Sequence, residues 1–193
     1  IQSIIPLLEK FEKNKKIKQI LLTSNTLSSS NIVEKFKFKK IVHQFFPIDT
    51  NILSKKFLDY WTPDVAFFID SEIWPNTLYN LNKRNIKTVL INGRITQKTF
   101  KRWMKLKFFA KKVFSNFDLC LSSSKESKNY LNKLGAKSPK FLGNLKFSQS
   151  ENEIVEIDKE LEKFIKSRKS WCASSTHKSE EIFCGNIHKE LKK

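Results

Sequence analysis

Arginine is scarce in this chain, although the chain is strongly basic. The 193 residues include 37 lysines and arginines against 19 aspartates and glutamates, but the arginines are only Arg84, Arg94, Arg102 and Arg168. Because bidentate recognition of phosphate and guanine favours arginine, the net charge of +18 is weak evidence for nucleic-acid binding, and we expect no nucleic-acid partner. A solvated lysine-rich surface is the simpler interpretation. Attraction to an anionic surface, such as anionic lipid, is the alternative.

Cysteine pairs and common enzyme motifs are absent as well. Cys120, Cys172 and Cys184 form no CxxC pair, which predicts reduced thiols and no zinc site. The motifs GxGxxG, GxxxxGK[ST], GxSxG and HExxH do not occur, which argues against a dinucleotide enzyme, a P-loop NTPase, an ordinary α/β-hydrolase and a zincin. No signal peptide is visible, and the apolar runs are too short to span a membrane.

What the sequence does contain is a regular alternation of short apolar strands and amphipathic helices. Strands are predicted at 18–23, 41–45, 64–69, 87–92, 117–121 and 140–142. Helices are predicted at 3–13, 31–38, 51–60, 74–84, 96–114 and 125–134, and the stretch 96–114 is expected to form one helix or two. We expect Ser28 to Asn31 to supply the N-cap of the second helix. This alternation is typical of the α/β class, with a doubly wound parallel sheet covered on both faces.

A change in pattern near residue 148 predicts a domain boundary. We expect a Rossmann-like domain at 1–148, a charged linker helix at 149–168 and the start of a second Rossmann-like domain at 169–193. The second domain is predicted to open with a strand at 170–174, which a helix at 177–191 follows.

Ligands of open α/β sheets bind beyond the carboxyl ends of the strands, so the residues just past each predicted strand are candidates. Asp70 and Glu72 follow one strand directly and could perform acid–base chemistry. Alternatively, Asp70 or Ser71 caps the next helix and Glu72 complements its dipole. Arg94 follows the next strand as a specific anion ligand or as a surface arginine, and Gly93 before it permits a tight turn or a positive φ.

Three further features allow two interpretations each. His43 is either a structural hydrogen-bonding residue or a catalyst. His177 follows a run of hydroxyl side chains, which could bind an anion or cap the helix with Glu180 as the capping-box partner. The basic, aromatic stretch 96–114 could contact a membrane surface or a phosphorylated lipid, or could be an amphipathic helix with its aromatic side chains in the core.

Several blocks, taken in their order and spacing, resemble one family. They are HQFFPID at 43–49, FLDYWTPDVAFFIDSEIWPN at 57–76, LINGRIT at 90–96, KTFKRW at 98–103, LGNLKF at 142–147 and ASSTHKSEE at 173–181. In these blocks the chain resembles the 3-deoxy-D-manno-octulosonic acid (Kdo) transferases of lipopolysaccharide synthesis. The resemblance implies a GT-B architecture and inverting transfer of Kdo from CMP-Kdo to the lipid A precursor, with no metal and no cofactor.

The resemblance also implies a location and a set of site residues. The partners would be the lipid A precursor, CMP-Kdo and the anionic surface of the inner membrane on its cytoplasmic side, reached peripherally or through an anchor outside this chain. Glu72 would be catalytic, Asp70, Asn92, Arg94, Lys98 and Arg102 would bind the acceptor, and Lys146, Ser175, Thr176 and His177 would bind the donor.

The alignment of Ile5, Pro6 and Leu7 with the family places the general base just before Ile1 and the first strand of the domain outside the chain. We therefore expect these residues to be a fragment that is inactive alone. The alternatives are another GT-B glycosyltransferase and a non-catalytic basic module that binds membrane surfaces or nucleic acid.

Overall fold

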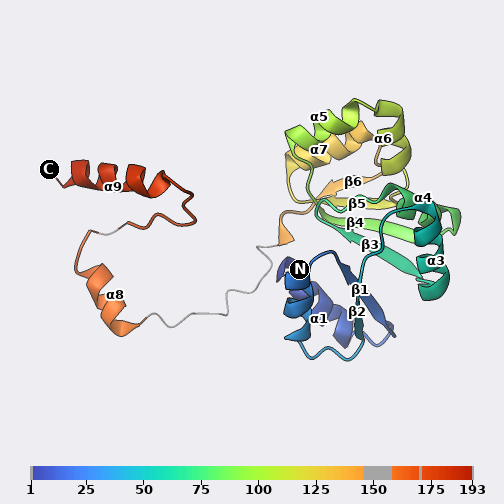
Figure 1. Cartoon of the computed structure of the whole chain (residues 1–193), viewed down its shortest axis with the longest axis horizontal. Helices are drawn as coiled ribbons and strands as arrows, with labels where there is room; N and C mark the ends of the chain where they lie inside the picture. Colours follow the sequence, from blue (N-terminus) through green and yellow to red (C-terminus); the bar gives the residue numbers. More distant parts are fainter. Residues whose placement is uncertain (1, 146–157, 170, 193) are drawn as a thin grey trace. The chain divides into compact units, whose positions relative to one another are not determined.

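The chain forms two units, which are described separately. The computed structural model describes residues 2–145, 158–169 and 171–192. Unit 1 is Ile1–Ser150 and unit 2 is Glu151–Lys193 (Figure 1). The boundaries predicted at 148 and 168 stay predictions.

Unit 1 is built from parallel strands with helices between them. The strands are β1 (Ile20–Ser24), β2 (Ile41–Phe45), β3 (Val65–Ile69), β4 (Lys87–Gly93), β5 (Leu119–Ser122) and β6 (Pro139–Phe141). The helices are η1 (Gln2–Ile4), α1 (Ile5–Lys13), α2 (Leu27–Glu34), α3 (Asn51–Trp61), α4 (Pro75–Lys83), α5 (Gln97–Met104), α6 (Lys107–Phe114) and α7 (Lys125–Leu134). The alternation of strands and helices predicted from the apolar periodicity is therefore confirmed.

The strands form two parallel sheets. β1 pairs with β2, while β3, β4, β5 and β6 pair in that order. In the described part of the chain, no backbone hydrogen bond joins the β1–β2 sheet to the β3–β6 sheet. Each parallel pair is connected through a helix, as parallel strands require. The result is the expected α/β fold of parallel strands flanked by helices, with the strands divided between two sheets.

Strand β3 shows how both sheet faces are covered. Phe68 packs into the main core with residues of α4 and α7, whereas its neighbour Ile69 packs against the buried side of α1. The ring of Phe67 also lies 5.6 Å from the ring of Phe11 of α1. Because side chains alternate across a strand, these contacts place different helices on the two faces. A strand with helices against both faces reads as a continuous apolar run, as 65–69 does, although Val65 and Phe67 remain exposed.

The main core lies between the β3–β6 sheet and helices α4, α6 and α7. Leu78, Leu90, Phe114, Phe117 and Leu131 are all completely buried there. Cys120 lies in the same cluster, and burial raises the pKa of its thiol to about 12. The thiol is therefore protonated at neutral pH, which agrees with its prediction as a small core residue.

Helix α2 differs from the sequence expectation in detail. It is capped by Thr26, whose hydroxyl accepts a hydrogen bond from the backbone N–H of Ser29, so it begins before the predicted cap at Ser28 to Asn31. The stretch 96–114, for which one helix or two were expected, forms two helices with a break at Lys105 and Leu106. Thr96 caps the first of them through the backbone N–H of Thr99.

Unit 2 contains α8 (Lys159–Lys166) and α9 (Glu180–Leu191). The strand predicted at 170–174 is wrong, because residues 171–174 form no strand. A strand needs a partner for its backbone hydrogen bonds, and unit 2 has no other strand in its described part. Helix α9 also begins three residues later than predicted.

Candidate active site at the carboxyl edge of the sheets

Loops from three strands meet at the carboxyl edge of unit 1. The side-chain amide of Asn25, just after β1, donates a hydrogen bond to Glu72 Oε2, just after β3, at 3.4 Å. Ser71 Oγ donates to the carbonyl oxygen of Arg94, just after β4, at 2.7 Å. The backbone N–H of Arg94 donates in turn to the carbonyl of Asp70 at 3.0 Å. The structure thus brings the loops of Glu72 and Arg94 together, as the topology predicted.

Asp70 and Asn92 face each other across neighbouring strands. Both have left-handed backbone conformations, with φ of 57° and 54°, and Asn92 Nδ2 donates a hydrogen bond to Asp70 Oδ1. Asn92 Oδ1 accepts a second bond from the backbone N–H of Leu145 at 3.1 Å. The side chain of Asn92 is buried, and both its N–H donor and its oxygen acceptor have hydrogen-bond partners in unit 1. Asn92 therefore has a structural role at this edge of the sheet.

Gly93 could permit a tight turn or a positive φ, and the positive φ occurs at its neighbour Asn92. A Cβ atom at Gly93 would lie 2.7 Å from Leu90 Cδ2, so a larger residue there would require a shift of the Leu90 side chain.

Helix α4 begins beside the candidate site, and its cap was not foreseen. Neither Asp70 nor Ser71 caps it. The carboxylate of Asp49 accepts hydrogen bonds from the backbone N–H groups of Asn76 at 2.9 Å and Thr77 at 2.8 Å. Asp49 belongs to the HQFFPID block that supported the family resemblance, but local spacing gives no sign of a cap that arrives from another loop. Glu72 is therefore not needed to cap α4, and its side chain is exposed.

Three predicted phosphate-binding cations lie at or just beyond this edge. Arg94 begins the loop after β4, and Lys98 and Arg102 lie one turn apart on α5, so they share a face of that helix. All three side chains are exposed. In the described residues no carboxylate forms an ion pair with any of them. They can therefore meet an anionic ligand without breaking an existing ion pair.

His43 has the structural role that was one of its two interpretations. Its Nε2 lies 2.8 Å from the hydroxyl of Ser24, and its Nδ1 lies 3.4 Å from the hydroxyl of Ser30. The ring thereby links β1, β2 and α2.

The predicted donor-binding residues belong to unit 2, apart from Lys146, which lies outside the described residues. Thr176 Oγ1 donates to Glu181 Oε1 at 2.9 Å, and the backbone N–H of His177 donates to Glu180 Oε2 at 2.8 Å. Glu180 thus contacts the backbone as a capping-box partner would. Ser175 has a left-handed φ of 57°. Their role towards a donor stays a prediction.

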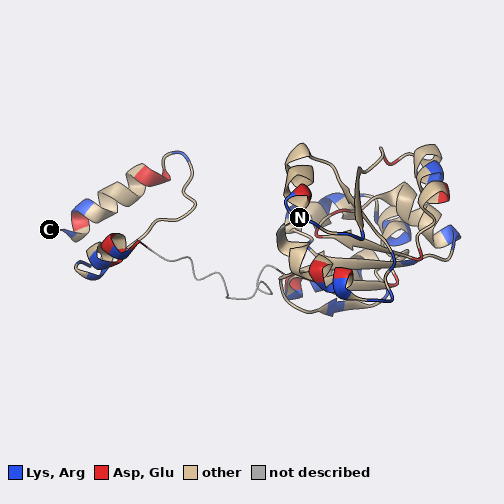
Figure 2. Ribbon diagram, turned by 90° about the horizontal axis from the view of Figure 1, so that it is seen from below, with Lys and Arg blue, Asp and Glu red and all other residues tan. Residues whose placement is uncertain are grey.

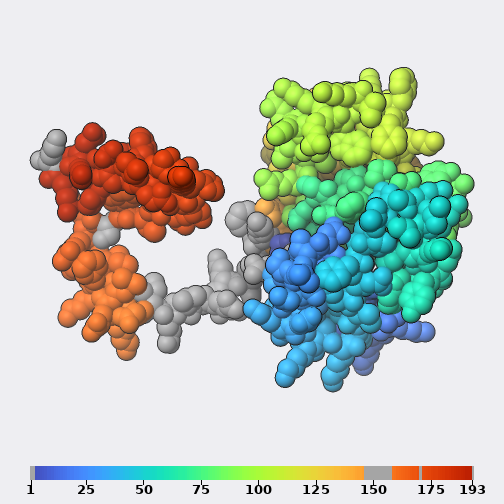
Figure 3. Space-filling view, viewed as in Figure 1, coloured from blue at the N-terminus to red at the C-terminus, as the bar shows by residue number. Residues whose placement is uncertain are grey.

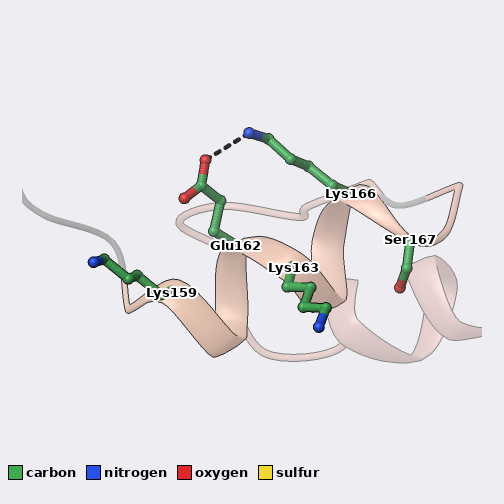
Figure 4. Close-up of a pocket in the computed structure, with 5 residues that line it drawn as sticks. All are labelled: Lys159, Glu162, Lys163, Lys166 and Ser167. Carbon is green, nitrogen blue, oxygen red and sulfur yellow. Dashed lines mark hydrogen bonds and ion pairs between the residues drawn. The ribbon is translucent and has the colours of Figure 1, made fainter.

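The surface depressions on unit 2 do not have the form of ligand-binding sites. One is lined by Lys159, Glu162, Lys163, Lys166 and Ser167, all from α8 or its C-cap, with an ion pair between Glu162 and Lys166 at 2.6 Å (Figure 4). A single exposed helix surface cannot enclose a small molecule. Among the described residues there is no group of three or more His, Cys, Asp or Glu side chains placed to hold a metal ion. No helix of the described ranges is long and apolar enough to cross a bilayer.

Comparison with known proteins identifies the family. A family model described as 3-deoxy-D-manno-octulosonic-acid transferase (kdotransferase) matches residues 1–149. A 3-deoxy-D-manno-octulosonic acid transferase of Rickettsia felis is 37% identical over 178 residues, which are 90% of this chain and 38% of that relative. A transferase of the same name from Rickettsia prowazekii is 38% identical over 84% of this chain and 35% of its own length.

A more distant transferase of that name, from Haemophilus influenzae, is 25% identical over 96% of this chain and 44% of its own length. The chain therefore spans less than half the length of these relatives. The family model covers most of the chain, including the loops that carry Asp70, Glu72, Asn92 and Arg94. We conclude that the chain belongs to the 3-deoxy-D-manno-octulosonic acid (Kdo) transferase family.

Proposed function

We propose that unit 1 forms the acceptor side of a Kdo transferase of the GT-B type. The whole protein would transfer Kdo from CMP-Kdo to the phosphorylated disaccharide of the lipid A precursor, with inversion and without a metal ion or cofactor. The observation that carries the proposal is the joining of the Glu72 and Arg94 loops through the bond from Ser71 Oγ to the Arg94 carbonyl. This bond places a carboxylate loop next to a cation loop at the ligand-binding edge of the fold.

The chemistry of the transfer assigns a part to each group. A sugar hydroxyl of the acceptor attacks the anomeric carbon of Kdo as CMP leaves, and a base must take the hydroxyl proton. The family resemblance gives the role of base to another glutamate. Glu72 would orient the attacking hydroxyl, since its exposed carboxylate accepts hydrogen bonds and at present accepts a long one from Asn25. Arg94, Lys98 and Arg102 would bind the acceptor phosphates through charge-assisted hydrogen bonds.

The donor side is proposed from the resemblance alone. Lys146, Ser175, Thr176 and His177 would contact CMP-Kdo. The exposed hydroxyl and imidazole groups of unit 2 are suited to phosphate and sugar oxygens, since they both donate and accept hydrogen bonds.

An anionic membrane surface, on the cytoplasmic side of the inner membrane, is proposed as a further partner. The α5–α6 segment carries exposed apolar side chains, with Leu106 exposed by 65% and Phe108 by 91%. The same segment carries only basic charges, from Lys98, Lys101, Arg102, Lys105, Lys107, Lys111 and Lys112. Figure 3 shows it, in green to yellow-green, on the outer surface of unit 1. Exposed aromatic groups among lysines favour the interface of an anionic bilayer, where a lipid acceptor resides.

Other basic residues are spread over both units (Figure 2). The scarcity of arginine, which supplies only four of the 37 basic residues, favours the transferase proposal over a nucleic-acid-binding module.

A chimera tests the proposed function. Residues 1–149 would replace the matching segment of the Rickettsia felis relative, whose remaining chain is kept, and transfer of Kdo from CMP-Kdo to a lipid A precursor would be measured. We expect transfer that is well above that of the same relative without the inserted segment. A folded chimera without transfer, or one that uses only an unphosphorylated acceptor, would refute the proposal.

A further inference from the structure

The buried amide of Asn92 connects two segments that are far apart in the sequence. On one side Asn92 Nδ2 donates to Asp70 Oδ1, in the loop after β3. On the other side Asn92 Oδ1 accepts from the backbone N–H of Leu145, which lies near the end of the described part of unit 1. Leu145 packs in turn against the cluster formed by Ile4, Ile5 and Leu8. The loop that precedes Glu72 and the segment at Leu145 therefore share one hydrogen-bonding residue.

Backbone hydrogen bonds also hold Asp70 in place beside Asn92. The N–H of Asp70 donates to the carbonyl of Ile91, and the carbonyl of Asp70 accepts from the N–H of Arg94, so Asp70 is bonded on both sides to β4 and the loop after it. Asp70 and Asn92 can both adopt left-handed conformations because Asn and Asp tolerate that region better than other non-glycine residues. The two side chains leave adjacent strand ends with nearly equal φ and meet.

We propose that Asn92 is a positioning residue that couples the order of the Asp70–Glu72 loop to the order of the segment at Leu145. The coupling acts through hydrogen bonds within unit 1 and does not depend on which substrate the protein uses. Because such coupling is reciprocal, a change that loosens the Asp70 side must also loosen the Leu145 side.

The test uses the isosteric pair of substitutions that this geometry allows. In Asn92→Asp two carboxylates face each other, so the bond to Asp70 is lost, although an oxygen at position 92 could still accept from Leu145. In the double variant Asp70→Asn/Asn92→Asp the direction of the bond is reversed. The new amide donates to the new carboxylate, whose second oxygen accepts from Leu145. The matched control is Asn85→Asp, at an exposed asparagine that also has a left-handed φ of 55°.

Amide hydrogen exchange of the 193-residue chain at neutral pH gives the readout, at the N–H groups of Leu145 and Arg94. We expect Asn92→Asp to raise the exchange rates of both N–H groups by about tenfold. The double variant should return both exchange rates to within about twofold of those of the original chain, and Asn85→Asp should change neither rate. Unchanged exchange at Leu145 in Asn92→Asp would overturn the proposal, as would a double variant that exchanges as fast as the single one. If Asn92→Asp fails to fold, a folded double variant with native exchange supports the coupling, and an unfolded one refutes it.

Discussion

The carboxylate oxygen Oδ1 of Asp49 accepts two hydrogen bonds from Thr77, one from its backbone N–H at 2.8 Å and one from its hydroxyl at 2.7 Å. Asn76 adds a backbone bond to Oδ2 at 2.9 Å. A charge from a separate loop thus satisfies the first N–H groups of α4, next to the loop that carries Glu72. This contact fixes where α4 begins, and the Glu72 side chain stays exposed.

Replacing Asp49 is expected to destabilise unit 1. Asp49→Ala removes a charged helix cap and leaves its donors without their partner, so we expect the free energy of unfolding to fall by about 2 to 3 kcal/mol. Urea unfolding followed by circular dichroism measures the change. Asp59→Ala is the control, since Asp59 forms an ion pair with Arg84 while its side chain is largely exposed, and a smaller loss of about 0.5 kcal/mol is expected. Equal losses in the two variants would contradict the capping role.

Removing the Glu72 carboxylate is expected to impair turnover more than folding. In the chimera with the Rickettsia felis relative, Glu72→Gln should lower kcat by about a hundredfold, because an uncharged amide orients the attacking hydroxyl less strongly than a carboxylate does. The melting temperature should stay unchanged, since the side chain is exposed. Asp64→Asn, at an exposed carboxylate next to the opposite end of β3, is the control and should keep full activity. Normal turnover in Glu72→Gln would make Glu72 structural.

The exposed apolar side chains of the α5–α6 segment, Leu106 and Phe108, are expected to contact lipid. Phe108→Ser should weaken binding of the chain to vesicles rich in phosphatidylglycerol by about tenfold, because a phenylalanine side chain contributes about 1.5 to 3 kcal/mol when it leaves water. Co-sedimentation with vesicles measures the binding. Tyr60→Ser, at a 79% exposed aromatic residue of α3, should bind as the original does. Equal binding by all three proteins, or equal binding to neutral vesicles, would refute a membrane contact here.

Asp118 is expected to make unit 1 less stable in acid. Its carboxylate accepts from the buried backbone N–H of Thr88 at 2.9 Å and from Lys87 Nζ at 3.0 Å. The bond from Thr88, followed by the interactions with Lys87, holds the pKa of Asp118 below its ordinary value. A folded-state pKa below the unfolded value stabilises the protein above the unfolded pKa, near 4, and this stabilisation is lost as the pH falls through the folded value.

Asp118→Asn removes this dependence. The difference in unfolding free energy between the original protein and the variant should therefore be constant from pH 7 to about 5 and shrink below that. Urea titrations at successive pH values measure it. A difference that stays constant down to pH 2 would show that the Asp118 charge does not contribute.

The sequence by itself determined the elements of unit 1 and predicted the edge at which its candidate site lies. Apolar periodicity depends on residues that are close in the chain, so strands such as 65–69 and helices such as Asn51–Trp61 could be predicted to within a residue or two. The rule that ligands bind at the carboxyl ends of parallel strands then made Glu72 and Arg94 candidates, among the polar residues that follow each strand. The blocks that resemble a family supplied the rest of the prediction.

The tertiary structure decided which of those residues have partners. Asp49 lies 28 residues before Thr77, and Asn92 lies 53 residues before Leu145, so no local pattern could reveal either bond. The strand predicted at 170–174 is wrong for a related reason, because a strand forms only where another strand satisfies its backbone. Local propensity sets what a segment can become, whereas hydrogen bonds between distant segments decide which side chains are used by the fold and which, like that of Glu72, remain exposed to a ligand.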